Sequence, residues 1–148
     1  RGQMNAEHFR KLERMYLGAN FNKALYETSS ITISEGRCSV GLEVNETYFH
    51  ALGAMHGSVY FKMLDDAAFF AVSSVVDDYF VLTTSFNINL IRPVSEGKVR
   101  AFGEIRFSSE NLFTASATLF NDVGKEVAFG TGNFVKSKVP LSQKIGYK

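Results

Sequence analysis

The chain has 148 residues, a formal net charge of +1, 45% hydrophobic residues and a single cysteine. This length suits one domain over residues 1–148 with enough apolar material for a core, and the near-zero charge argues against a nucleic-acid partner. One cysteine excludes a disulfide framework and favours a reducing, cytoplasmic setting.

The N-terminal segment predicts a short amphipathic helix over residues 5–17, where apolar residues recur at three- and four-residue spacing. Gly18 ends this helix, and His8 is expected on its surface. The segment is polar and lacks the apolar stretch of a secretory signal. Residues 1–3 precede the first methionine and are either a cloning remnant or part of the natural chain.

Two short segments follow, residues 31–34 and 40–44, in which apolar side chains alternate with polar or small ones. The pair Glu35-Gly36 between them is typical of a tight turn. We therefore expect a β-hairpin with one face toward the core.

Residues 56–76 predict the helix around which the rest is organised. Apolar side chains cover most of its circumference, which is typical of a buried helix, and Ser58 is the expected N-cap. Asp65 and Asp66 lie side by side in the middle, about 100° apart on the helix. At least one of them should face surroundings drier than bulk water. Burying a carboxylate there costs folding free energy unless it is paired with a cation or protonated, so an unpaired acid indicates a functional role.

The two acids have different expected roles. Lys62 lies four residues before Asp66, so we expect an ion pair on the helix surface, worth about 0.3–0.5 kcal/mol. Asp65 is then the candidate for chemistry, the alternative being a structural acid satisfied by hydrogen bonds.

From Tyr79 the period of the pattern changes to two, which predicts a strand ending near Leu90. Strict alternation puts Thr83 on one face of this strand and Phe86 on the other. Three further strands are expected as a meander, over residues 99–107, 112–120 and 126–135.

The last predicted strand carries small residues at alternate positions, Ala128, Gly130 and Gly132. Such a row allows another element to pack closely against the strand, and we expect that element to be the buried helix. The tail over residues 136–148 carries four lysines and no acid. We expect a frayed, solvated end; the alternative is an electrostatic aid for a ligand that bears phosphate.

This order of elements predicts an α+β fold, in which a curved antiparallel β-sheet is wrapped around one long central apolar helix, with a short N-terminal helix beside it. No repeat or interdomain linker interrupts the chain. No apolar run approaches the ~20 residues of a membrane span.

The motifs resemble those of the hotdog-fold acyl-CoA thioesterases, in the phenylacetyl-CoA thioesterase (PaaI-like) branch of the 4-hydroxybenzoyl-CoA thioesterase superfamily. The resemblance rests on His56-Gly57-Ser58 at the helix opening, on Asp65 nine residues after the histidine, and on the later segments 86–93 and 130–134. It extends from about residue 50 to 135. Ser58 departs from the second glycine of that group, and His50 from the asparagine that many relatives carry.

The resemblance implies a mechanism for thioester hydrolysis. Asp65 acts as general base or nucleophile, and the Gly57 N–H binds the carbonyl oxygen at the positive end of the helix. The acid of one subunit commonly faces the helix opening of a neighbour, which implies a homodimer or homotetramer. The remaining candidate residues for binding the substrate are His50, His56, Ser58 and Thr83.

The expected activity is hydrolysis of an acyl-CoA to free acid and CoA. No cofactor is expected beyond the CoA of the substrate, and the three histidines and the cysteine lack the spacing of a metal site. The absence of a Gly-x-Ser-x-Gly motif disfavours a serine hydrolase. Two alternatives stay open: a non-catalytic acyl-CoA or lipid-binding protein on the same fold, and a hotdog dehydratase acting on a hydroxyacyl thioester.

Overall fold

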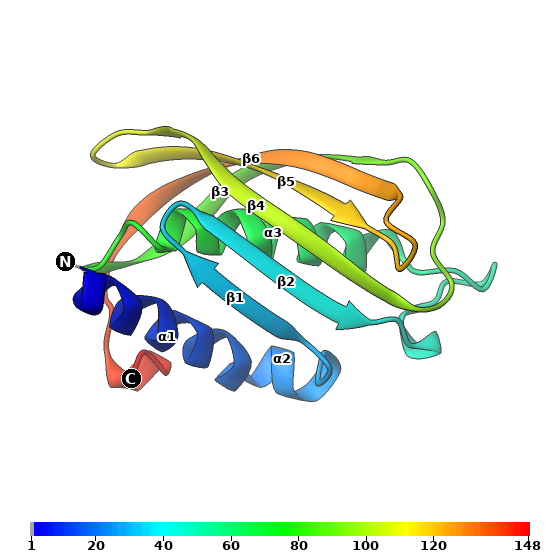
Figure 1. The fold of residues 1–148 in the computed structure, drawn as a ribbon, viewed down its shortest axis with the longest axis horizontal. Helices are drawn as coiled ribbons and strands as arrows, with labels where there is room; N and C mark the ends of the chain where they lie inside the picture. Colours follow the sequence, from blue (N-terminus) through cyan, green and yellow to red (C-terminus); the bar gives the residue numbers. More distant parts are fainter. Residues whose placement is uncertain (1) are drawn as a thin grey trace.

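The computed structural model describes residues 2–148, with side chains described from Asn5 onward, and contains one curved sheet that encloses a long helix (Figure 1). In chain order the elements are α1 (Gly2–Gly18), α2 (Asn20–Leu25), β1 (Ser30–Ser34), β2 (Arg37–Glu43), the 3-10 helix η1 (Glu46–Tyr48), α3 (Gly57–Ser73), β3 (Tyr79–Leu90), β4 (Lys98–Ser108), β5 (Leu112–Phe120), β6 (Glu126–Pro140) and the 3-10 helix η2 (Gln143–Ile145).

The six strands form a single antiparallel sheet in the order β1-β2-β4-β5-β6-β3. The predicted α+β arrangement is therefore confirmed. Figure 1 shows α3 lying across the concave face of the sheet, with α1 beside β1. One edge of the sheet, β1, is thus flanked by a helix. The other edge, β3, pairs only with β6, and its outer side is open in a single chain.

Close packing between α3 and the sheet depends on a glycine of β4. A β-carbon on Gly103 would lie 2.7 Å from the Ala68 nitrogen and closer still to the Ala67 carbonyl, so only a glycine fits here. The prediction that Gly130 and Gly132 of β6 admit the helix is wrong. Phe86 of β3 lies over both of these glycines, and β-carbons there would come within 2.7 Å of its ring at Gly130 and within 2.8 Å at Gly132.

Strand β3 contains a β-bulge that the sequence pattern did not reveal. Thr83 pairs with Phe134 of β6 and Ser85 with Asn133, so Thr84 is an extra residue. The predicted placement of Thr83 and Phe86 on opposite faces is therefore wrong. The extra residue restarts the alternation, and both side chains face the helix.

The C-terminal tail is docked rather than frayed. Strand β6 continues to Pro140, and the Tyr147 hydroxyl donates to His8 Nδ1 at 2.7 Å. His8 is buried rather than on the surface, and its Nε2–H donates to the Ser73 carbonyl at 2.9 Å. Arg14 Nε donates to the Lys148 carbonyl at 2.6 Å. The tail thus fastens α1 to the end of α3.

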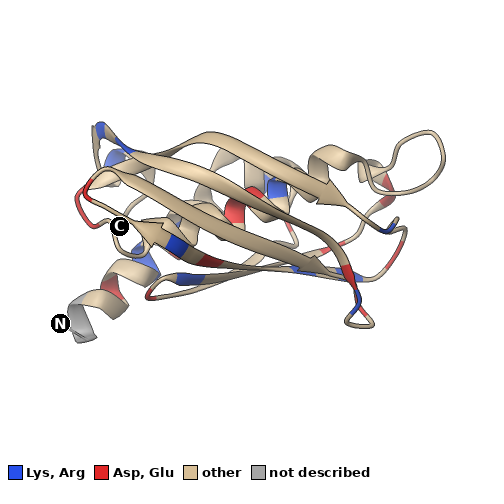
Figure 2. Cartoon of the chain, turned by 90° about the horizontal axis from the view of Figure 1, so that it is seen from above, with Lys and Arg blue, Asp and Glu red and all other residues tan. Residues whose placement is uncertain are grey.

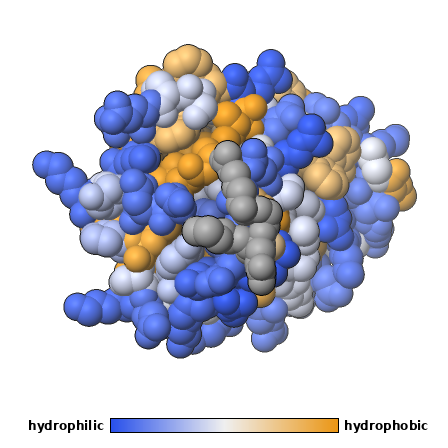
Figure 3. All heavy atoms as spheres, turned by 60° about the vertical axis from the view of Figure 1, so that its left-hand side comes forward, coloured by the Kyte–Doolittle hydropathy of each residue, from blue (hydrophilic) through white to orange (hydrophobic). Residues whose placement is uncertain are grey.

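Charges of both signs are interspersed over the chain (Figure 2), in keeping with its low net charge. At the end that carries both termini, apolar atoms are gathered inside a largely hydrophilic rim (Figure 3). No helix within the described part of the chain is long and apolar enough to cross a membrane.

Candidate active site

One stripe of α3 is less buried than the rest of the helix and faces β3. It consists of every fourth residue: Gly57, Phe61, Asp65 and Phe69. Asp65 Oδ1 accepts a hydrogen bond from the Thr83 hydroxyl at 2.9 Å. Thr83 faces the helix in the same phase as the buried Val81, and the bulge that follows Thr83 turns Phe86 to this face as well. A carboxylate and a hydroxyl are thereby fixed next to the open edge of the sheet.

Burial raises the pKa of Asp65 from its usual value to about 6. The hydrogen bond from Thr83 lowers this pKa, the neighbouring Asp66 raises it, and Lys62 lowers it. Burial acts most strongly, because removing a carboxylate from water penalises its charged form. Asp65 is thus a carboxyl group that ionises close to neutral pH, as a general base requires.

The opening of α3 is capped by a histidine. His56 is the N-cap, and its Nδ1 accepts from the Ser58 N–H at 3.0 Å and lies 2.8 Å from the Ser58 hydroxyl. The predicted N-cap, Ser58, is therefore wrong, and this residue lies in the first turn. The Gly57 N–H has no acceptor among the residues that the structure describes, and it carries the positive partial charge of a helix N-terminus.

A cavity of about 400 Å³ lies at this opening, and both His50 and Gly57 line it. Its wall includes Tyr60, whose hydroxyl donates to the Arg92 carbonyl at 2.8 Å. His50 is exposed, and its Nδ1 accepts from the Leu52 N–H at 3.1 Å. Its Nε2 forms no hydrogen bond with any described residue and is free to meet a ligand.

One chain brings these residues together in two separate groups. Asp65 lies with Thr83, whereas Gly57 lies with His50. Gly57 and Asp65 are eight residues apart on one helix, which corresponds to about 12 Å along its axis. A carbonyl bound to the Gly57 N–H is therefore out of reach of Asp65 in the same chain.

Large apolar side chains are exposed on the helical stripe and along the open strand β3. Phe61 is 40% exposed, and three residues on or next to β3, Leu82, Leu90 and Ile91, are 46–48% exposed. Apolar side chains gathered at an unpaired strand edge are typical of a protein interface.

Two aromatic residues, Phe61 and Phe86, lie beside Asp65, and Phe86 was not predicted to lie near the site. Phe61 packs edge-on against Phe86, with ring centroids 5.7 Å apart. Phe61 lies on the same helical stripe as Gly57 and Asp65, so its position was readable from the spacing. Phe86 was hidden by the bulge, because strict alternation points it away from the helix.

The second acid has a different environment from the one predicted. The ion pair between Lys62 and Asp66 is present, but Lys62 is only 8% exposed and the Asp66 side chain only 17%. The prediction of a surface pair is therefore wrong. Tyr16 of α1 donates its hydroxyl to Asp66 Oδ2 at 2.8 Å. No sequence signal connects Tyr16 with Asp66, because their contact depends on how α1 docks.

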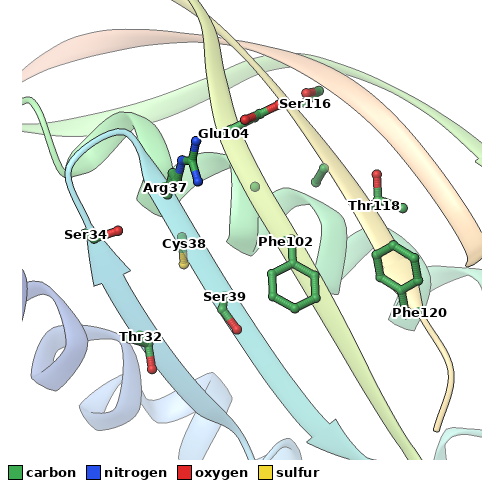
Figure 4. A pocket seen from close by; sticks show the side chains of 12 residues that line it. Thr32, Ser34, Arg37, Cys38, Ser39, Phe102, Glu104, Ser116, Thr118 and Phe120 are labelled. Carbon is green, nitrogen blue, oxygen red and sulfur yellow. The ribbon is translucent and has the colours of Figure 1, made fainter. Parts of the chain in front are cut away.

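Another cavity, of about 430 Å³, lies on the outer face of the sheet (Figure 4). It is lined mainly by serine and threonine side chains, with Phe102 and Phe120 at one end and Arg37 and Glu104 at the other. The predicted hydrolytic residues lie on the opposite side of the sheet. Within residues 2–148, no three histidine, cysteine or acidic side chains cluster as a metal site would require.

A family model described as the thioesterase superfamily matches residues 52–128, just over half of the chain. No curated protein sequence matches.

Solved structures give the fold. The Escherichia coli PaaI protein from the phenylacetic acid degradation operon matches with a TM-score of 0.83 at 19% identity, over 93% of this chain and 99% of its own. A conserved protein from Pseudomonas aeruginosa matches with a TM-score of 0.76 at 24% identity, over 84% of this chain and 98% of its own. A mutant of the phenylacetic acid degradation protein PaaI from Thermus thermophilus matches with a TM-score of 0.71 at 21% identity, over 80% of this chain and 100% of its own. These likenesses confirm the predicted hotdog fold.

Proposed function

The chain belongs to the thioesterase superfamily, and on this basis we propose that it hydrolyses acyl-CoA thioesters in the manner of the PaaI-like branch. The observation that carries the proposal is the half-buried Asp65, whose pKa is raised to about 6 and whose carboxylate is held by Thr83. A carboxyl group of this kind is ionised at pH 7 yet retains enough basicity to accept a proton.

The proposed reaction uses two groups on opposite sides of the thioester. The Gly57 N–H donates to the carbonyl oxygen and stabilises the negative charge that develops there. Asp65 either takes a proton from the attacking water or attacks the carbonyl carbon itself. The carbon–sulfur bond then breaks, and CoA leaves as the thiolate. Where Asp65 itself has attacked, water then hydrolyses the mixed anhydride on Asp65, which releases the acid and restores the carboxylate. His50, His56 and Ser58, near the Gly57 end, are proposed to contact the substrate.

Both groups reach one thioester only if they come from different subunits. The apolar stripe of α3 and the open edge of β3 support a dimer in which the two helices run antiparallel. On such a two-fold axis, Gly57 of each chain approaches Asp65 of the other, and Phe61 lies midway between them on the stripe. We propose a homodimer as the smallest active unit, either alone or within a homotetramer.

A thiol-release assay across straight-chain and aryl-CoAs tests the function. The expected result is saturable release of free CoA from at least one acyl class. If CoA thioesters raise the melting temperature without any release of thiol, the chain is a non-catalytic acyl-CoA-binding protein instead.

The rate should depend on pH through Asp65. Because its pKa is about 6, kcat/KM should be constant above pH 7 and fall tenfold per pH unit below about pH 5. The measurement is kcat/KM from pH 4.5 to 8.5 in buffers of constant ionic strength. A profile flat down to pH 4.5 would remove Asp65 from the mechanism.

The Gly57 N–H can be deleted with little other change. Proline suits the first position of a helix, and the extended backbone of His56 suits the residue before a proline. Gly57→Pro should lower kcat about 100-fold, since one donor to the oxyanion is lost. Gly57→Ala keeps the N–H and is the matched control, with little loss expected.

Co-expression of the Gly57→Pro and Asp65→Asn chains tests whether the site is shared. A mixed dimer has one site with both groups intact and one with neither. Activity should therefore rise to a substantial fraction of wild type, well above the strongly reduced activity of either parent. No recovery in isolated mixed dimers would place both groups of each site in one chain.

A further inference from the structure

A buried polar cluster lies on the side of α3 that faces α1. It consists of Lys62 and Asp66 of α3 and Tyr16 of α1. Lys62 Nζ contacts Asp66 Oδ2 directly and donates to the Tyr16 hydroxyl at 3.2 Å, while this hydroxyl donates to Asp66 Oδ2 at 2.8 Å. The three groups thus form a closed triangle of hydrogen bonds.

Aromatic rings enclose the ammonium group of this cluster. Lys62 Nζ lies 4.4 Å from the centroid of the Tyr26 ring, 5.0 Å from that of Tyr16 and 5.5 Å from that of Phe21. Such contacts stabilise a desolvated cation. They come from α1, α2 and the loop after α2, so the N-terminal helices complete the surroundings of Lys62.

Stability alone does not account for such a cluster. Taking two charges out of water costs several kcal/mol per ion, and well-packed apolar residues often serve a core as well or better. Burial raises the pKa of Asp66, while Lys62 and the Tyr16 hydroxyl lower it. A charged aspartate here depends on both partners.

The cluster lies next to the proposed catalytic acid, since Asp66 follows Asp65 directly on the helix. On α3 the charged groups that act on Asp65 are Asp66, which raises its pKa, and Lys62, which lowers it. From β3 the Thr83 hydroxyl meets it. On β6, Lys136 pairs with Asp78 at 3.4 Å and is not among the groups that act on Asp65.

Other titratable groups face Asp66 from the side of α3 that meets α1 and β2. The Tyr16 phenol of α1, the Tyr26 phenol and the buried Cys38 thiol of β2 all have their pKa raised, by burial first and by Asp66 second. Glu13 of α1 raises the pKa of Cys38 as well. None of these groups acts on Asp65 directly.

We propose that Lys62, Asp66 and Tyr16 are positioning residues that hold the charge of Asp66 in place beside Asp65 and so set the pH range over which Asp65 acts. The proposal rests on the hydrolytic function proposed above. When ionised, Asp66 places a negative charge beside Asp65 that favours the protonated form of Asp65. Lys62 and Tyr16 favour this ionised form of Asp66 against the burial that raises its pKa overall. The docking of α1 and α2 is thereby linked to the chemistry at α3.

Asp66→Asn tests this link. The amide oxygen still accepts from Tyr16 and Lys62, but the negative charge beside Asp65 is gone while the positive charge remains. The acid limb of kcat/KM should move to lower pH by about one unit. Carbon-13 NMR titration of the Asp65 carboxyl, identified by its loss in Asp65→Asn, should show the same downward shift.

Two variants serve as controls. The double variant Lys62→Met/Asp66→Asn removes both charges. In it, the pKa of Asp65 should lie between its value in wild type and its value in Asp66→Asn. Glu7→Gln breaks an ion pair with Lys11 of the same four-residue spacing, with the atoms 3.2 Å apart, but on the exposed face of α1. It should leave the titration of Asp65 unchanged.

The NMR titration requires no substrate, so it separates this proposal from the proposed hydrolysis. A folded Asp66→Asn chain in which Asp65 titrates as in wild type would overturn the proposal. If Asp66→Asn does not fold, the double variant takes its place. Asp66 acts on Asp65 more strongly than Lys62 does, so a downward shift is still expected there, and an unchanged titration would again overturn the proposal.

Discussion

Replacing Asp65 with asparagine should lower kcat about 1000-fold and at the same time make the protein more stable. The loss of rate follows because an amide neither accepts a proton from water nor attacks a carbonyl, and a positioned base contributes about 10²–10⁴-fold. The fold should be unaffected, because the amide oxygen can still accept the hydrogen bond from Thr83.

The gain in stability follows from the raised pKa of Asp65. The folded chain holds this proton up to about pH 6, whereas an ordinary aspartate releases it near pH 3.8. Ionised Asp65 therefore costs stability above pH 6, and this cost disappears as the pH falls through 6 toward 4. Asp65→Asn should be more stable by about 2 kcal/mol at pH 8 and by almost nothing at pH 4.

Urea unfolding of both proteins at pH 8 and pH 4 measures this effect, alongside the thiol-release assay. Asp77→Asn is the control, because Asp77 is exposed beyond the end of α3 and should change neither rate nor stability. An Asp65→Asn protein that keeps its activity, or that is less stable at pH 8, would contradict the environment described for Asp65.

Gly103→Ala should be strongly destabilising although it adds only one methyl group. A β-carbon at this position meets the backbone of α3 at Ala67 and Ala68, and backbone cannot rotate aside as a side chain can. The helix and β4 would have to separate, at a cost of about 3 kcal/mol or more. Activity per folded molecule should fall as well, because α3 carries both Gly57 and Asp65.

Two glycine variants control for this effect. Gly18→Ala places its methyl group where no atom lies within 4 Å, so stability should change little. Gly132→Ala meets the Phe86 ring rather than backbone, and we expect an intermediate cost because a side chain can adjust. Equal stability of the Gly103 and Gly18 variants in urea unfolding would show that α3 does not pack as closely as described.

The overall arrangement of this fold was predictable because its signals are local. The apolar circumference of α3 and the period of two in the last four strands appear within short windows of the sequence. The proposed pairing of Asp65 with a helix opening was suggested only by the nine-residue interval from His56. The functional interpretation of that interval came from family resemblance rather than from pattern alone.

The features that escaped prediction depend on contacts between distant segments. Lys62 and Asp66 form the expected pair, yet their burial is decided by α1 and α2, which arrive from another part of the chain. The same holds for His8, which is buried because Tyr147 docks on it. Gly103 resembles any strand glycine until the helix is placed against it.

The bulge at Thr84 has a consequence for how this sequence tolerates change in length. Without the extra residue, side chains would alternate without interruption from Tyr79 to Leu90. Phe86 would then point away from the helix and would no longer pack against Gly130 and Gly132 of β6. A substitution alters one side chain. A deletion at Thr84 would instead turn every side chain in the second half of β3 to the opposite face of the sheet. Insertions and deletions near Thr84 should therefore disturb the helix-facing side of β3 more than an exchange of residue types there.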